Sequence, residues 1–225
     1  MDSLDRQAWR GFLQLQAMLA LFLFLPAGTW RYWQGWLYWL AFGGATVAIT
    51  RHFLVHDRAL IQRRLVVGPA AERERGQKWI QALASVLFIG FHVVAGLDHR
   101  YGWSAVAPFW SVLGAAGVLA GFGVVFLTFR ENSHTSAVIE VGAGQTVVST
   151  GPYAVIRHPM YAGALLLFLG GALALGSIPD LAIAAALGLA MVLRLRSEER
   201  FLVENLPGYE AYRRRVRHRL LPGIW

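Results

Sequence analysis

Four stretches of the sequence run for about the thickness of a membrane without an Asp, Glu, Lys or Arg. They cover residues 11–28, 33–50, 79–97 and 103–129. A helix rises about 1.5 Å per residue and the hydrocarbon core of a bilayer is about 30 Å thick, so roughly 20 apolar residues are enough to cross it. Each stretch is therefore predicted to be a transmembrane helix. No small-residue cleavage site follows the first stretch, which is expected to stay in the mature protein as an anchor.

A fifth apolar region, residues 160–193, is interrupted at 177–180 by the sequence Ser-Ile-Pro-Asp. This break predicts two shorter helices joined by a tight turn, a helical hairpin. From residue 197 onward apolar and basic residues alternate, which indicates an amphipathic tail interrupted at Pro207 and Gly208. The predicted fold is therefore all-α, a polytopic integral membrane helix bundle that forms a single domain over residues 1–225. Four full spans occupy 1–129, and a long loop, the C-terminal hairpin and the tail occupy 130–225.

The composition supports lipid as the solvent of this chain. Hydrophobic residues make up 56% of the sequence and charged residues only 15%, which is too apolar for a soluble domain. The net charge of +8 would suit a nucleic-acid partner, but the basic residues flank apolar stretches, so no nucleic acid is expected. The sequence contains no cysteine, which excludes disulfides, thiolate metal ligands and thiol nucleophiles.

The arginines and lysine fall on alternate connections between the predicted spans. They gather before the first span, between residues 51 and 78, and after residue 193, whereas only Arg31 and Arg100 belong to the opposite side. Cytoplasmic loops of membrane proteins carry the excess of positive charge. Both termini and the loop 51–78 are therefore predicted to be cytoplasmic, in a protein of the cytoplasmic (inner) membrane.

The loop 130–158 contains short valine-rich pieces on either side of a Gly142-Ala143-Gly144 sequence, which predicts extended segments around a turn. The glycines are not interpreted as a dinucleotide-binding fingerprint, because no strand-to-helix crossover accompanies them. His92, inside the third span, is an intramembrane ionisable residue, and a neutral imidazole that is hydrogen-bonded within the bundle is favoured over a functional role. No set of His and carboxylates has metal-ligand spacing, so no metal is predicted.

The most informative segment is Arg157-His158-Pro159, which indicates the start of a helix. Proline fits the first turn of a helix, and the positive end of the helix dipole together with Arg157 can hold an anion. Tyr161 and Gly163 add an aromatic surface and a place for close approach of a ligand to the backbone. The alternative interpretation is an ordinary interfacial helix start whose Arg and His contact lipid headgroups.

The pair Glu198-Glu199 stands where the second half of the hairpin returns to the same membrane face. Its carboxylates can simply form salt bridges with the neighbouring Arg194, Arg196 or Arg200, each contributing a few tenths of a kcal/mol when exposed. The alternative is that a cationic helix start and an acidic helix end meet, which complements a zwitterionic ligand such as S-adenosylmethionine.

The order of these motifs resembles the membrane-embedded methyltransferases that include isoprenylcysteine carboxyl methyltransferases and phospholipid methyltransferases. The resemblance covers roughly the C-terminal half and rests on Arg130-Glu131-Asn132-Ser133, Gly144-Gln145, residues 149–153, Arg157 to Gly163, residues 175–177, Glu198-Glu199, Pro207-Gly208-Tyr209 and residues 221–225. It implies S-adenosylmethionine as cofactor, bound by His158, Tyr161, Gly163, Glu198 and Glu199 beside the loop 130–158. Arg157, His158 and Glu199 are the implied catalytic residues, and Glu131 and Asn132 lie on the substrate side.

The predicted function is methyl transfer from S-adenosylmethionine to a lipophilic acceptor at the cytoplasmic membrane face. A carboxylate acceptor is favoured over a lipid amine, because an amine or a hydroxyl needs a positioned base whereas a carboxylate is already anionic. Two alternatives stay open: an NADPH-dependent membrane reductase of a sterol-like or isoprenoid substrate, and a non-catalytic transporter or scaffold. The expected partners are the lipophilic acceptor and the membrane itself; the sequence does not indicate an oligomeric state.

Overall fold

The computed structural model describes residues 2–65, 68, 70, 72, 75–135, 138, 139, 141, 142 and 144–225, and these residues form helices and connections without a strand. The all-α prediction is confirmed for this part of the chain. In order, the elements are α1 (Ser3–Ala27), α2 (Trp33–His56), α3 (Arg58–Leu65), α4 (Arg75–Tyr101), α5 (Pro108–Glu131), the 3-10 turn η2 (Gly151–Ala154), α6 (Pro159–Leu175), α7 (Pro179–Asn205) and α8 (Tyr209–Arg215).

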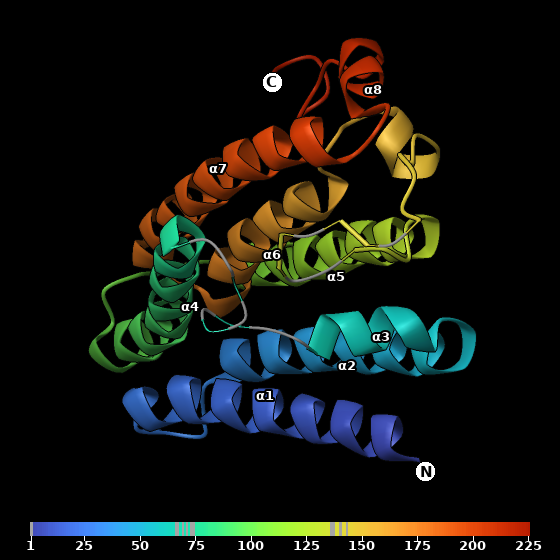
Figure 1. Ribbon diagram of the computed structural model, residues 1–225. Coiled ribbons are helices and arrows are strands. Elements are labelled where there is room, and N and C mark those ends of the chain that lie inside the picture. The colour runs from blue at the N-terminus through green and yellow to red at the C-terminus, as the bar shows by residue number, and fades with distance from the viewer. Residues whose placement is uncertain are drawn as a thin grey trace.

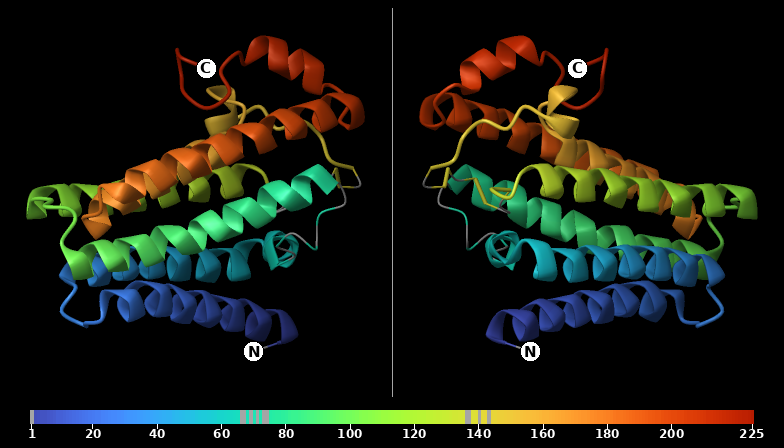
Figure 2. Two further views of the ribbon diagram at one scale, coloured as in Figure 1. Left: turned by 90° about the vertical axis from the view of Figure 1, so that its left-hand side faces the viewer. Right: turned by 90° about the vertical axis from the view of Figure 1, so that its right-hand side faces the viewer.

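The long helices lie alongside one another and form a bundle with two distinct ends (Figures 1 and 2). One end carries the short α1–α2, α4–α5 and α6–α7 connections and is called the far end. The other end carries the start of α1, the helix α3, the turn η2, the helix α8 and the C-terminal residues, and is called the site end (Figure 2). Loops that are distant in the sequence therefore meet at the site end.

Three helices among the described residues are long and apolar enough to cross a membrane: α1, α4 and α5. Of the four predicted spans, these correspond to 11–28, 79–97 and 103–129. The second predicted span, 33–50, forms the 24-residue helix α2, but α2 is not among the helices that are apolar enough to cross a membrane. Its first turns carry Trp33, Trp36 and Trp39, which lower its mean hydropathy and suit the membrane interface better than the hydrocarbon core.

The predicted helix boundaries need correction at two places. The fourth span does not begin at residue 103, because α5 starts at Pro108, the residue that pre-sets the first helical φ. The hairpin turn occurs as predicted, since α6 ends before Gly176, whose φ of 70° favours glycine, and α7 begins at Pro179. The tail, however, does not begin as a separate element at residue 197. Helix α7 continues to Asn205, and the break at Pro207 and Gly208 separates it from α8.

Helices α5 and α6 pack through glycines at backbone distance. A Cβ atom built on Gly121 would lie 2.7 Å from the Gly163 carbonyl oxygen, and one on Gly163 would lie 2.9 Å from the Gly121 carbonyl oxygen. Gly114 and Gly170 are related in the same way, with a Cβ on Gly170 only 2.8 Å from the Gly114 carbonyl oxygen. Small residues at helix interfaces allow this approach and are the usual means of association within a bilayer. The pair α5–α6 therefore tolerates no side chain at these positions.

Some polar side chains inside the bundle are hydrogen-bonded to neighbouring groups. His92 contacts the Tyr38 hydroxyl at 3.1 Å through Nε2 and the Phe88 carbonyl oxygen at 2.7 Å through Nδ1. The expectation that His92 is a hydrogen-bonded residue of the bundle is confirmed. Near the far end, the Asp98 carboxylate accepts hydrogen bonds from the backbone N–H and the hydroxyl of Ser104, at 2.8 and 2.7 Å.

Candidate active site

The segment Arg157-His158-Pro159 forms the start of α6, as predicted. His158 is the N-cap residue and Pro159 is the first helical residue. Backbone hydrogen bonds tie this start to the C-terminal segment, because the N–H of Arg157 donates to the His218 carbonyl at 2.9 Å and the N–H of His158 donates to the Arg219 carbonyl at 3.0 Å. The last residues of the chain therefore form part of the wall around the helix start.

Glu199 on α7 is the centre of a buried charge network at this point. Its Oε1 atom accepts from Arg157 Nε at 2.6 Å and lies 3.3 Å from His158 Nε2, while its Oε2 atom accepts from Arg219 Nε at 2.8 Å. The side chains of Arg157, His158 and Glu199 are each at most 5% exposed. Arg157 also donates to two backbone carbonyls, those of Val216 and Arg217, at 2.8 and 2.9 Å.

This network determines the ionisation of Glu199. Burial alone would raise the pKa of Glu199, but hydrogen bonds from His158, Arg157 and Arg219 outweigh it and lower the pKa to about 2. The carboxylate is therefore ionised at neutral pH and neutralises the Arg157 guanidinium. The predicted meeting of a cationic helix start and an acidic helix end does occur, but its first result is an internal ion pair between α6 and α7.

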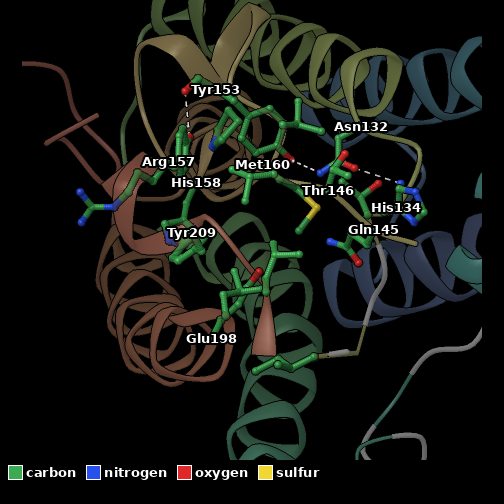
Figure 3. Close-up of a pocket in the computed structure, with 18 of the residues that line it drawn as sticks. Asn132, His134, Gln145, Thr146, Tyr153, Arg157, His158, Met160, Glu198 and Tyr209 are labelled. Atoms are coloured by element: carbon green, nitrogen blue, oxygen red, sulfur yellow. Dashed lines mark hydrogen bonds between the residues drawn. The ribbon is translucent and has the colours of Figure 1, made fainter. Parts of the chain in front are cut away.

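The neighbouring acid, Glu198, faces a different space. Its Oε2 atom accepts a hydrogen bond of 2.7 Å from the Tyr161 hydroxyl on α6. Glu198 and His158 both line a cavity at the site end, whereas the Arg157 guanidinium points away from the middle of that cavity (Figure 3). The two adjacent glutamates therefore have separate roles: Glu199 stabilises the wall, and Glu198 supplies charge to the cavity.

The cavity has a volume of about 100 Å³ and lies between the loop 132–148, the start of α6, the end of α7 and α8. Its polar and aromatic lining includes Asn132, His134, Thr135, Gln145, Tyr153, His158, Tyr161, Glu198, Tyr209 and Tyr212. A second cavity of about 170 Å³ adjoins it, since Met160, Tyr161 and Glu198 line both, and there Arg64 and Arg194 are added. One acid and several aromatic rings thus face the first cavity, and two arginines face the second.

Two polar atoms at the first cavity have no hydrogen-bond partner among the described residues. They are the buried hydroxyl oxygens of Tyr209 and Thr135. Burial, followed by the charges of Glu199 and Glu198, raises the pKa of Tyr209, so its hydroxyl stays protonated and can donate. Buried polar groups are normally paired, and an unpaired one marks a place where a ligand group or water fits. The aromatic rings and the carboxylate can contact a positively charged group, and the amides and the two unpaired hydroxyls can hydrogen-bond to a polar ligand.

The predicted site residues do not all line this cavity. Asn132 lines it, and its side-chain amide donates to the Tyr153 hydroxyl at 3.3 Å. Gly163 does not line it; a Cβ atom there would lie 2.9 Å from the Gly121 carbonyl oxygen of α5, and this packing is sufficient to explain the glycine. Glu131 is also outside: it accepts a hydrogen bond from the Thr150 hydroxyl and lies against Gly151, whose φ is 55°.

Several lining residues were assigned no site role from the sequence. Tyr209 and Tyr212 come from α8, and the Tyr212 hydroxyl donates to the Tyr153 carbonyl at 2.8 Å. His134 and Gln145 come from the loop, and the predicted turn there is confirmed: the Gln145 N–H donates to the Gly142 carbonyl at 3.1 Å, while Ala143 lies outside the described residues. The break at Pro207-Gly208 was the available signal, because it allows α8 to fold back over the site.

An apolar groove approaches the same region from the side of the bundle. It has a volume of about 420 Å³, lies between α1, α4, α6 and α7, and includes Met18, Ile80, Ala84, Phe88, Phe168 and Met191. Arg194 stands at the shared border, since it lines both this groove and the second cavity. Its guanidinium forms an ion pair of 2.7 Å with the buried Glu72. The groove is therefore mainly apolar, and the Arg194–Glu72 ion pair stands where it meets the site.

The fold and the site define an integral membrane protein with a polar cavity at one end of its helix bundle. Residues 108–207 match the family described as phospholipid methyltransferase. This stretch runs from the first residue of α5 to the turn before α8, so the resemblance to membrane-embedded methyltransferases is confirmed over the part of the chain that builds the site. The chain is also 34% identical over 127 residues to the cobalt-zinc-cadmium resistance protein CzcN of Cupriavidus metallidurans, a match that covers 52% of this chain and 51% of that protein. The chain thus spans about half the length of this curated relative.

Proposed function

We propose that the protein transfers a methyl group from S-adenosylmethionine to a lipophilic acceptor. The observation that carries this proposal is the placement of the cavity: Glu198, His158 and the rings of Tyr153 and Tyr161 converge within the stretch that matches the methyltransferase family. The unpartnered Tyr209 hydroxyl faces them from α8, just beyond that stretch. The family match does not favour a reductase or a transporter.

The proposed cofactor site is the first cavity. S-adenosylmethionine supplies an electrophilic methyl group on a positively charged sulfur. Glu198 attracts positive charge, and the rings of Tyr153, Tyr161 and Tyr209 offer faces for a cation or an adenine. The Arg157–Glu199 ion pair holds the walls from α6 and α7 together, so that these groups keep their positions without reorganisation during the reaction.

The proposed acceptor is an amphiphile with a carboxylate, whose apolar part occupies the groove between α4 and α7. Arg64 and Arg194 line the second cavity together with Glu198, and Arg194 is also paired with Glu72, so the two guanidinium groups offer planar N–H donors to the oxygens of an anionic group. A carboxylate has a reference pKa near 4 and attacks without a base. The groove excludes water around it, which strengthens the attraction between unlike charges.

The test uses the purified protein in detergent and radiolabelled S-adenosylmethionine. We expect label in the organic phase with a long-chain carboxylic acid as acceptor, and much less with the amine of the same chain length. Calorimetry with S-adenosylhomocysteine and with NADPH measures cofactor binding separately from acceptor methylation. Saturable NADPH binding without binding of S-adenosylhomocysteine contradicts the proposal, and labelled amine as the main product contradicts the carboxylate acceptor alone.

A further inference from the structure

The outer face of α7 changes from leucine to arginine along one helical stripe. Leu189, Leu193, Arg196 and Arg200 follow one another at every third or fourth position, so they share a face of the helix. All four are exposed, with Leu189 at 61% and Leu193 at 45%. Exposed leucines on a membrane helix contact acyl chains, and arginines that follow them reach the level of the headgroups.

The arginine part of this stripe and residues of the C-terminal segment together line a cleft. The cleft has a volume of about 270 Å³ and is lined by Arg196, Arg200, Arg213 and Arg219, together with Glu199 and Glu204. Glu199 is already neutralised, because its two oxygens accept from Arg157 and Arg219 and contact His158. The cleft is therefore positively charged. It lies on the outer side of α7, apart from the cavity that Glu198 lines.

The arginines of the cleft are unevenly paired. Arg213 forms an ion pair with Glu210 at 2.9 Å, and Arg219 forms one with Glu199 at 2.8 Å. Within the described part of the chain, none of the ion pairs includes Arg196 or Arg200. Several guanidinium groups around one small space repel one another unless an anion joins them, and their planar donors match the oxygens of a phosphate.

The C-terminal residues that follow Arg219 include exposed apolar side chains. The C-terminal residues Leu221 and Ile224 are 48% and 79% exposed. The Arg219 guanidinium lies over the ring of Trp225 at 5.0 Å from its centroid. Exposed aliphatic and aromatic residues beside a basic cleft are typical of a surface that lies at the headgroup level of a bilayer.

We propose that this cleft binds the headgroup phosphate of an anionic phospholipid from the surrounding bilayer. Arg196 and Arg200 contact the phosphate, and an acyl chain follows Leu189 and Leu193 toward the far end. A free phosphate ion shares the headgroup chemistry but not the acyl chain, and the continuous leucine and arginine stripe is the feature that selects the lipid. This proposal does not depend on the methyltransferase function, because the cleft is separate from the cavity.

Native mass spectrometry of the full-length protein in detergent tests the proposal with phosphatidylglycerol as the probe. The double variant Arg196→Gln/Arg200→Gln is compared with Arg214→Gln/Arg215→Gln, which removes the same charge from α8 outside the cleft. We expect the Kd of the first bound phosphatidylglycerol to rise about tenfold in the cleft variant and to change less than about twofold in the α8 variant, since only the former loses the charge-assisted hydrogen bonds. Phosphatidylcholine binds more weakly than phosphatidylglycerol, and millimolar inorganic phosphate does not displace the lipid.

Three results overturn the proposal. Equal losses in the two double variants would show a general effect of surface charge. Displacement of the lipid by inorganic phosphate would show a site for a free anion, and equal binding of phosphatidylcholine would show that the acyl chains alone are recognised. Thermal unfolding of both variants in detergent, measured with the lipid absent, serves as the control for the fold. Both pairs of arginines are surface residues, so their midpoints are expected to match that of the wild type.

Discussion

The hydroxyl of Tyr209 is buried beside the site cavity and has no partner in the described part of the chain, whereas that of Tyr212 donates to the Tyr153 carbonyl at 2.8 Å. Substitutions of these two tyrosines on α8 are therefore expected to affect different quantities, ligand affinity for Tyr209 and the free energy of unfolding for Tyr212. Removing a hydroxyl that makes no hydrogen bond in the folded protein costs no stability, but removing one that is paired costs about 1 kcal/mol. A hydroxyl that a ligand uses affects affinity instead.

We predict that Tyr209→Phe leaves the free energy of unfolding in detergent unchanged or slightly higher and weakens binding of S-adenosylhomocysteine about tenfold. Tyr212→Phe is the matched control: it is expected to lower the free energy of unfolding by about 1 kcal/mol. Calorimetry and thermal unfolding measure the two effects. If Tyr209→Phe destabilises the protein and leaves affinity unaltered, the hydroxyl is a structural group and the cavity does not bind the cofactor there.

Glu199 gives a prediction on pH. Its pKa is lowered from 4.5 to about 2, so its contribution to stability is fully present above about pH 4.5 and is lost as the pH falls toward 2. The shift corresponds to a contribution on the order of 3 kcal/mol at neutral pH. Glu199→Gln is therefore expected to lower the free energy of unfolding at pH 7, because it leaves the buried Arg157 without its counter-ion, and to flatten the loss of stability in acid.

Thermal unfolding in detergent between pH 7 and pH 3 measures this effect. The exposed Glu204 lies one and a half turns further along α7, and Glu204→Gln serves as the control that keeps the acid response of the wild type. An acid response of Glu199→Gln that equals the wild type would mean that other carboxylates control acid unfolding.

At the scale of elements, the glycine contact between α5 and α6 makes a sharp comparison possible. A Cβ on Gly121 would meet the Gly163 carbonyl oxygen at 2.7 Å, whereas Gly123, on the same helix, has open space around its Cβ position. We predict that Gly121→Ala lowers the unfolding midpoint strongly, because a backbone oxygen cannot move away as a flexible side chain does. Gly123→Ala is expected to keep or raise the midpoint, since alanine is the better helix former. Similar midpoints for the two variants would contradict the close packing.

The sequence predicts elements better than it predicts what their side chains meet. Apolar length alone predicted α1, α4 and α5, because crossing a membrane imposes a minimum run of apolar residues. Helix α3 was not predicted, since its eight residues leave no such signal. The start of α6 at His158-Pro159 was predicted because proline has a strong preference for the first turn.

The site was predictable only in part for a related reason. Local sequence placed Arg157, His158 and Glu198 at one membrane face, but it does not reveal contacts with distant segments. The carbonyl groups that bind the Arg157 guanidinium belong to residues 216 and 217, and no periodicity links such remote positions. The role implied for Arg157 stays a prediction: in the structure its guanidinium pairs with Glu199 and with these carbonyl groups, and Glu198 lines the cavity.

At the scale of the molecule, the start of α1, the helix α3 and the C-terminal residues all lie at the site end (Figure 2). Half of the arginines belong to these segments, and positively charged segments stay in the cytoplasm. We predict that the site end is cytoplasmic. A phosphatase that works only outside the cytoplasm should be inactive when it is fused after Trp225, and a fluorescent protein fused at the same position should be fluorescent. The same two fusions after residue 103 should give the opposite results. Phosphatase activity after Trp225 would place the site in a compartment without the proposed cofactor.

The joined pair α5–α6 also limits how the site can admit a molecule. Both helices reach the site end, and the loop that carries Asn132 and Tyr153 connects them there. Because backbone touches backbone along Gly114, Gly121 and their partners on α6, the two stems of that loop keep a constant separation. The wall of the cavity on the α5–α6 side is therefore fixed. The opposite wall, formed by the end of α7 and by α8, is joined to the rest of the site through hydrogen bonds, so widening of the entrance there requires breaking bonds such as that from the Tyr212 hydroxyl to the Tyr153 carbonyl.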